Sequence, residues 1–138
     1  MNQLPSDDRS LAPLRSMALL ALLLGAAGVM TLMLRAGGRS RPLLLVPLFA
    51  AWDLSPFVLL WIADRFAAGW TKATRTALYS LMMIVAAGSV AYYVADAIWP
   101  RSAQAAFPYV IAPPVSWLLI AGGLGLTALC SRKPSRWA

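Results

Sequence analysis

The chain has 138 residues, is 60% hydrophobic and 12% charged, and carries a net charge of +7. A soluble domain of this length cannot bury so much apolar surface, because small domains keep much of their surface in water. The sequence has no His, no Glu and one Cys, which excludes a disulfide, His-ligated haem, the usual zinc sites and His-assisted nucleophiles within one chain. We therefore expect a membrane protein that is not an enzyme and holds no cofactor.

The N-terminal part of the chain divides into a polar and an apolar segment. Residues 1–16 are polar and contain two prolines, so we expect a mostly unstructured tail. Residues 17–34 are uncharged and apolar, and a run of about 18 residues is the lower limit for a spanning helix. Small residues at Gly25 and Ala27 suit signal-peptide cleavage, but the apolar run continues beyond them, which favours an uncleaved span.

Three further apolar runs are long enough to cross a bilayer: they cover residues 43–62, 77–99 and 108–130. The segment 63–76 carries Trp70 and basic residues, which is typical of an interfacial loop. Residues 131–138 form a basic C-terminal tail. Barrel strands would alternate apolar and polar residues, and these runs do not. The predicted fold is all-α, a membrane-spanning bundle of four transmembrane helices.

The distribution of Lys and Arg predicts the orientation of the bundle. The side with both termini carries eight of these residues near the spans, and the other side carries four. By the positive-inside rule both termini are predicted to be cytoplasmic. Since no single element carries a basic stripe, we expect contact with anionic lipid headgroups and no binding of nucleic acid. Short loops and the absence of an Asn-x-Ser/Thr site are consistent with a bacterial plasma (inner) membrane.

Asp53 is the eleventh of the twenty residues in the second apolar run, and therefore lies near mid-membrane. An ionised carboxylate there costs about 2.5–3.5 kcal/mol on insertion scales. One interpretation is a proton or cation site; the other is an interhelical hydrogen bond worth about 0.6 kcal/mol. Pro56 removes the helical donor to the Trp52 carbonyl, and the hydroxyl of Ser55 can replace it.

The third run contains a second polar cluster of Ser89, Tyr92 and Asp96. Tyr92 and Asp96 are four residues apart, a spacing at which a phenol and a carboxylate can bond on one helix face. Asp96 lies near the outer end of its run, at a depth roughly 10 Å from Asp53, so the two aspartates are not expected to pair. The alternative is that Asp96 simply lies at the membrane interface.

Small residues and prolines mark candidate packing and bending positions. A small-residue face lets another helix approach closely; the candidates are Ala87, Ala91 and Ala95 in the third run, and Ala121 and Gly125 in the fourth. Pro113 and Pro114 either bend the fourth helix or mark its true beginning. Both alternatives are open from the sequence.

Two functions are compatible with these residues. The favoured hypothesis is a non-catalytic accessory or helix-packing subunit, because the chain offers few reactive groups. The alternative is a homo-oligomeric transporter or channel, coupled to protons or cations, that uses Asp53. The expected partners are accordingly another membrane protein or further copies of this chain.

Overall fold

The computed structural model describes residues 4–36, 44–99 and 107–131. They form four α-helices and one short 3-10 helix, and no strand occurs among them: α1 (Leu4–Ala36), α2 (Leu45–Phe66), η1 (Ala67–Gly69), α3 (Lys72–Ile98) and α4 (Phe107–Ser131). All four α-helices are long and apolar enough to cross a membrane. The prediction of an all-helical chain with four such helices is confirmed.

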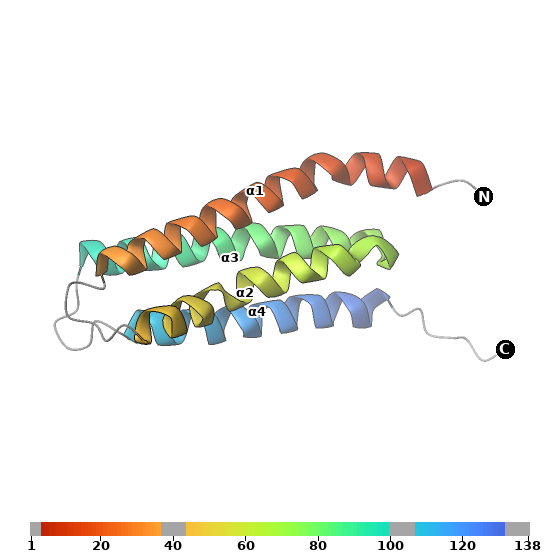
Figure 1. Cartoon of the computed structure of the whole chain (residues 1–138). Coiled ribbons are helices and arrows are strands. Elements are labelled where there is room, and N and C mark those ends of the chain that lie inside the picture. The colour runs from red at the N-terminus through yellow and green to blue at the C-terminus, as the bar shows by residue number, and fades with distance from the viewer. Residues whose placement is uncertain (1–3, 37–43, 100–106, 132–138) are drawn as a thin grey trace.

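The four helices lie side by side in one elongated bundle (Figure 1). Helix α1 packs chiefly against α3, and α4 packs against both α3 and α2. The beginning of α1 and the end of α4 lie at the same end of the bundle, together with the end of α2 and the beginning of α3 (Figure 1). We call this the N/C end.

The core is formed mainly by side chains from α1, α2 and α3, and Ile120 of α4 adds to it. Tyr79, Met33, Leu60 and Leu78 are fully buried. Helices α1 and α3 approach closely at Gly25 of α1, where an added Cβ would lie 2.8 Å from the Cβ of Ala86 on α3. A glycine is needed there because any side chain would force the two helices apart.

The outside of the bundle is also apolar. Large apolar side chains are exposed on every helix, among them Leu23, Leu48, Ile84 and Leu118. Apolar exposure on this scale is uncommon in monomers that live in water. It suits helices whose outer faces are covered by hydrocarbon.

The segment 1–16 differs from the expected unstructured tail, because α1 begins at Leu4 and continues through Pro13. Leu11 and Ala18 are buried on one side of the helix. Arg15, between them, bonds to α2. Contact with the bundle along one face stabilises helical turns that an isolated polar segment would not form.

The segment 63–76 is also more helical than expected. Helix α2 extends to Phe66, η1 follows directly, and α3 begins at Lys72 rather than at residue 77. The hydroxyl of Thr71 accepts a hydrogen bond from the Thr74 N–H at 3.3 Å, which caps the first turn of α3. The linker 37–42 and the tail beyond Ser131 lie outside the described residues.

Candidate functional site

Asp53 lies inside the bundle, where helices α2 and α3 meet. Its side chain is buried, with 2% of the residue exposed. The hydroxyl of Tyr93 on α3 donates to its Oδ1 at 3.2 Å. The other oxygen, Oδ2, is buried and has no hydrogen-bond partner among the described residues. The carboxyl group therefore joins two helices while half of its bonding capacity is unused.

The backbone carbonyl of Trp52, next to Asp53, receives a local side-chain hydrogen bond, as the sequence predicts. Pro56 is buried within α2, and the hydroxyl of Ser55 donates to the Trp52 carbonyl at 2.6 Å. The same hydroxyl accepts a hydrogen bond at 3.1 Å from Nε1 of Trp117 on α4. Ser55 thus replaces the missing backbone donor and also connects α2 to α4.

The second predicted cluster is not assembled as expected. Tyr92 is exposed, and no hydrogen bond joins it to Asp96 among the described residues. The tyrosine that meets a carboxylate is Tyr93, whose ring lies edge-to-face against that of Tyr92 with centroids 5.9 Å apart. One residue along a helix turns a side chain by about 100°, which is why Tyr93 points to Asp53 while Tyr92 points outward.

Ser89 of this cluster lines an apolar groove between α3 and α4. The groove has a volume of about 260 Å³, and its other walls include Tyr92, Ile111 and Ser116. Ser116 is buried and donates to the Ala112 carbonyl at 2.9 Å. Helix α4 begins at Phe107, before the two prolines, so the alternative that the helix starts after them is wrong.

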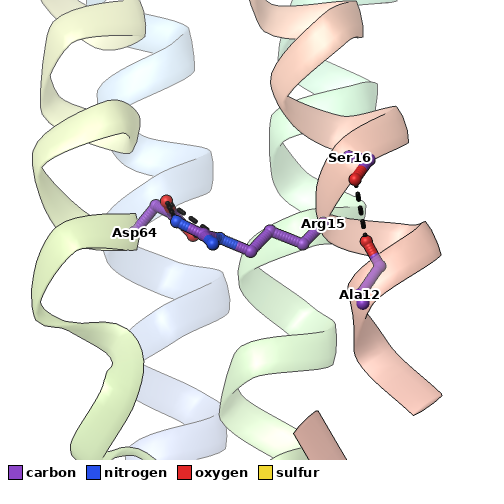
Figure 2. A network of polar contacts seen from close by, with 4 residues as sticks. All are labelled: Ala12, Arg15, Ser16 and Asp64. Atoms are coloured by element: carbon purple, nitrogen blue, oxygen red, sulfur yellow. Dashed lines mark hydrogen bonds and ion pairs between the residues drawn. The ribbon is translucent and has the colours of Figure 1, made fainter. Parts of the chain in front are cut away.

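An ion pair that the sequence does not predict joins α1 and α2 at the N/C end. Arg15 donates through Nε to Asp64 Oδ1 at 2.9 Å and through Nη2 to Oδ2 at 2.8 Å. Figure 2 shows the arginine reaching across from α1 to the carboxylate, with Ser16 bonded to the Ala12 carbonyl beside it. The Asp64 side chain is 2% exposed and that of Arg15 47% exposed.

This ion pair forms part of a polar cavity with a volume of about 550 Å³. Two further arginines, Arg65 and Arg75, line the cavity together with Tyr79. The guanidinium of Arg65 lies over the ring of Trp61, 4.7 Å from its centroid, a cation–π arrangement. The described lining therefore concentrates three guanidinium groups and one carboxylate at the N/C end.

The predicted packing residues face outward. Ala87, Ala91, Ala95 and Ala121 are exposed, and Gly125 is half-buried with nothing within 4 Å of the place where a Cβ would stand. The close contact inside the chain is made at Gly25 and Ala86 instead. The alanines of α3 form an uncovered face, which we call the alanine face (Ala87, Ala91 and Ala95).

Neither metal chemistry nor a known relative explains this arrangement. Among the described residues, no three His, Cys, Asp or Glu side chains gather as a metal site requires. Comparison with protein families, curated proteins and solved structures gives no match.

Proposed function

We propose that the chain is an integral membrane protein that packs against another membrane protein as a non-catalytic accessory subunit. The observation that carries this proposal is the exposed alanine face of α3. Residues four apart lie one above the other on a helix, so the three alanines offer a continuous shallow strip. A spanning helix of the partner can approach α3 there as closely as α1 does at Gly25.

The polar side chains support this role because they act as links within the bundle. Asp53 accepts from Tyr93, Ser55 bridges α2 and α4, and Arg15 pairs with Asp64. Asp53 lines neither the groove between α3 and α4 nor the polar cavity at the N/C end. A chain whose polar groups serve to join its own helices is suited to presenting a fixed outer surface to a partner.

The same proposal includes a location and an orientation. We place the N/C end in the cytoplasm and the bundle in a bacterial plasma membrane. The basic residues Arg65, Lys72 and Arg75 belong to the N/C end (Figure 1), in agreement with the positive-inside rule. A reporter fused to the C-terminus should be active only in the cytoplasm, and activity on the outer side would contradict this orientation.

Native mass spectrometry of the gently extracted complex tests the accessory role. We expect a different protein at fixed stoichiometry, and we expect Ala91→Trp to release it by filling the alanine face. The matched control is Leu118→Trp, at an exposed apolar position of α4, which should retain the partner. Recovery of the wild-type chain only as a monomer or homo-oligomer would contradict the proposal.

A second candidate function is favoured by the unused Oδ2 of Asp53. In this proposal the chain is a homo-oligomeric transporter or channel, and Asp53 takes up a proton or cation near mid-membrane. Asp53→Asn should then abolish flux into liposomes while the protein remains folded. In the accessory role the same variant leaves partner recovery unchanged, so the two measurements separate the two functions.

A further inference from the structure

Ser89 of α3 is a buried serine whose hydroxyl has no hydrogen-bond partner in the part of the chain that the structure describes. The residue is 9% exposed. Other helical hydroxyls bond back to the carbonyl four residues earlier, as those of Thr31 and Ser116 do at 2.8 and 2.9 Å, a usual local bond for Ser and Thr inside a helix. Because Ser89 lines the groove between α3 and α4, its donor is left for whatever occupies that groove.

Two further hydroxyl groups belong to side chains of the same groove. Tyr92 is exposed, and its hydroxyl has no bond among the described residues. Ser116, on the α4 wall, gives its hydrogen to the Ala112 carbonyl, so its oxygen still has the capacity to accept a bond. The remaining side chains of the groove are apolar: Ile84, Val85, Ile111, Ala112, Val115 and Leu119. An apolar groove with a few polar groups is the usual form of a small-molecule site.

The groove lies near the middle of the bundle, at about the level of Asp53. Tyr93 follows Ser89 by one turn of α3, and its hydroxyl reaches Asp53 at 3.2 Å. Since helical side chains lean toward the helix N-terminus, the hydroxyls of Tyr93 and Ser89 lie within one turn of each other in height. In the proposed membrane location this is hydrocarbon, roughly 15 Å from the interface. Water and phospholipid esters are scarce there, so a partner for Ser89 must be carried by a molecule that dissolves in the hydrocarbon.

The size of the groove selects among such molecules. Its volume is about 260 Å³, whereas an apolar cavity of about 150 Å³ is enough to bind benzene. One six-membered ring with small substituents therefore fits. The ring of Tyr92 at the edge of the groove offers a surface for aromatic contact. A flat ring with carbonyl oxygens and a hydrocarbon tail matches the shape, the free donors and the apolar surroundings together.

We propose that the groove between α3 and α4 binds the head ring of a lipid-soluble quinone, with a ring carbonyl accepting the hydroxyl of Ser89 and a further oxygen accepting that of Tyr92. The quinone is bound unchanged, as a ligand, and its tail leaves into the surrounding hydrocarbon. The inference rests on the proposed membrane location. It goes beyond the accessory role and does not depend on the partner at the alanine face.

Native mass spectrometry of the purified full-length chain tests the proposal, with decylubiquinone or decylbenzene added to the micelles. Decylubiquinone is a benzoquinone with a decyl tail, and decylbenzene has the same tail on a ring without oxygens. We expect one retained decylubiquinone per chain and at least fivefold weaker retention of decylbenzene. Ser89→Ala and Tyr92→Phe should each weaken decylubiquinone binding about fivefold, the usual effect of losing one neutral hydrogen bond.

Gly88→Leu provides a second variant that blocks the groove by volume. Gly88 lines the groove, and nothing lies within 4 Å of the place where its Cβ would stand, so the chain accepts the larger side chain without a clash at that atom. Leucine also favours a helix more than glycine does. We expect this variant to remain folded and to bind decylubiquinone at least about tenfold more weakly, because the leucine takes the place of the ring.

The matched control is Thr31→Ala, which removes an exposed hydroxyl on α1 that is already bonded to the Ala27 carbonyl and should leave quinone binding unchanged. Failure of the wild-type chain to retain decylubiquinone, or equal retention of decylbenzene, would overturn the proposal. Equal binding by wild type, Ser89→Ala and Gly88→Leu would also overturn it, by placing the quinone elsewhere. Because the assay uses the chain alone, its failure is distinct from the failure to find a partner protein.

Discussion

The two buried aspartates of α2 are held in opposite ways. Asp64, at the N/C end, is bonded through both oxygens to a guanidinium. Asp53, eleven residues earlier and therefore roughly 16 Å farther from the N/C end, has one hydrogen bond from a phenol and one unbonded oxygen. The half-exposed position of Arg15 keeps part of its charge in water, which an ion pair enclosed in the middle of the bundle could not do. Asp64 therefore forms a full ion pair at a position where its partner stays solvated. Asp53 is bonded to an uncharged donor at a position where both members of an ion pair would be desolvated.

The largest loss of unfolding free energy is expected from Arg15→Met, which leaves the buried carboxylate of Asp64 without its partner. Breaking a buried pair costs about 3–5 kcal/mol, and the partial exposure of Arg15 points to the lower limit, about 3 kcal/mol of unfolding free energy. Reversible unfolding in mixed micelles measures this loss. Arg35→Met, an exposed arginine on the same helix, is the control and should change stability by less than about 0.5 kcal/mol. Similar values for both variants would mean that the ion pair contributes no more than a surface contact.

A smaller effect is expected from Tyr93→Phe, which removes the only described donor to Asp53. Interhelical hydrogen bonds in membranes contribute about 0.6 kcal/mol on average and reach about 1.7 kcal/mol. We expect a loss of about 1 kcal/mol in the same unfolding measurement, because the carboxyl group is then buried with neither oxygen bonded. Tyr92→Phe, at the exposed neighbour, is the matched control. A loss as large as that of Arg15→Met would show that Asp53 depends on its partner as strongly as Asp64 does.

The smallest effect is expected from Asp53→Asn. The amide oxygen still accepts the Tyr93 hydroxyl, and the amide nitrogen takes the place of the unbonded Oδ2, so stability should change by less than about 0.6 kcal/mol. Asp64→Asn in parallel should be clearly destabilising, since it removes the charge that Arg15 faces. Equal effects of the two substitutions would remove the distinction between the aspartates.

The sequence predicts the helices better than their ends. Long uncharged runs identify four helices because spanning a bilayer leaves few other structures. The average polarity of residues 1–16 does not predict the start of α1; the informative signal is the recurrence of Leu11, Ala18 and Leu22 on one buried face. The apolar run that begins at residue 77 does not predict the start of α3; the informative signal is Thr71, because Thr is among the preferred N-cap residues.

Within the candidate site, the sequence predicts only the hydrogen bonds between residues that are close in the chain. The hydrogen bond from Ser55 to Trp52 follows from Pro56 and the geometry of a single helix, and it is present. The partner of Asp53 lies 40 residues away and that of Asp64 lies 49 residues away. Such pairings depend on how each helix is rotated about its axis, which one sequence without relatives does not specify.

The ion pair between Arg15 and Asp64 also bears on the order in which the chain is assembled. Helix α1 packs chiefly against α3, yet α2 is made before α3, so α1 leaves the ribosome long before its main packing partner exists. Arg15 and Asp64 join α1 and α2, which are both made before α3. Once the end of α2 has been synthesised, this ion pair can hold α1 and α2 together as a helical hairpin. Helix α3 can then pack against a surface that is already formed. During biogenesis the ion pair would then shorten the conformational search by which the helices find their packed arrangement. This effect is separate from its contribution to the stability of the folded bundle.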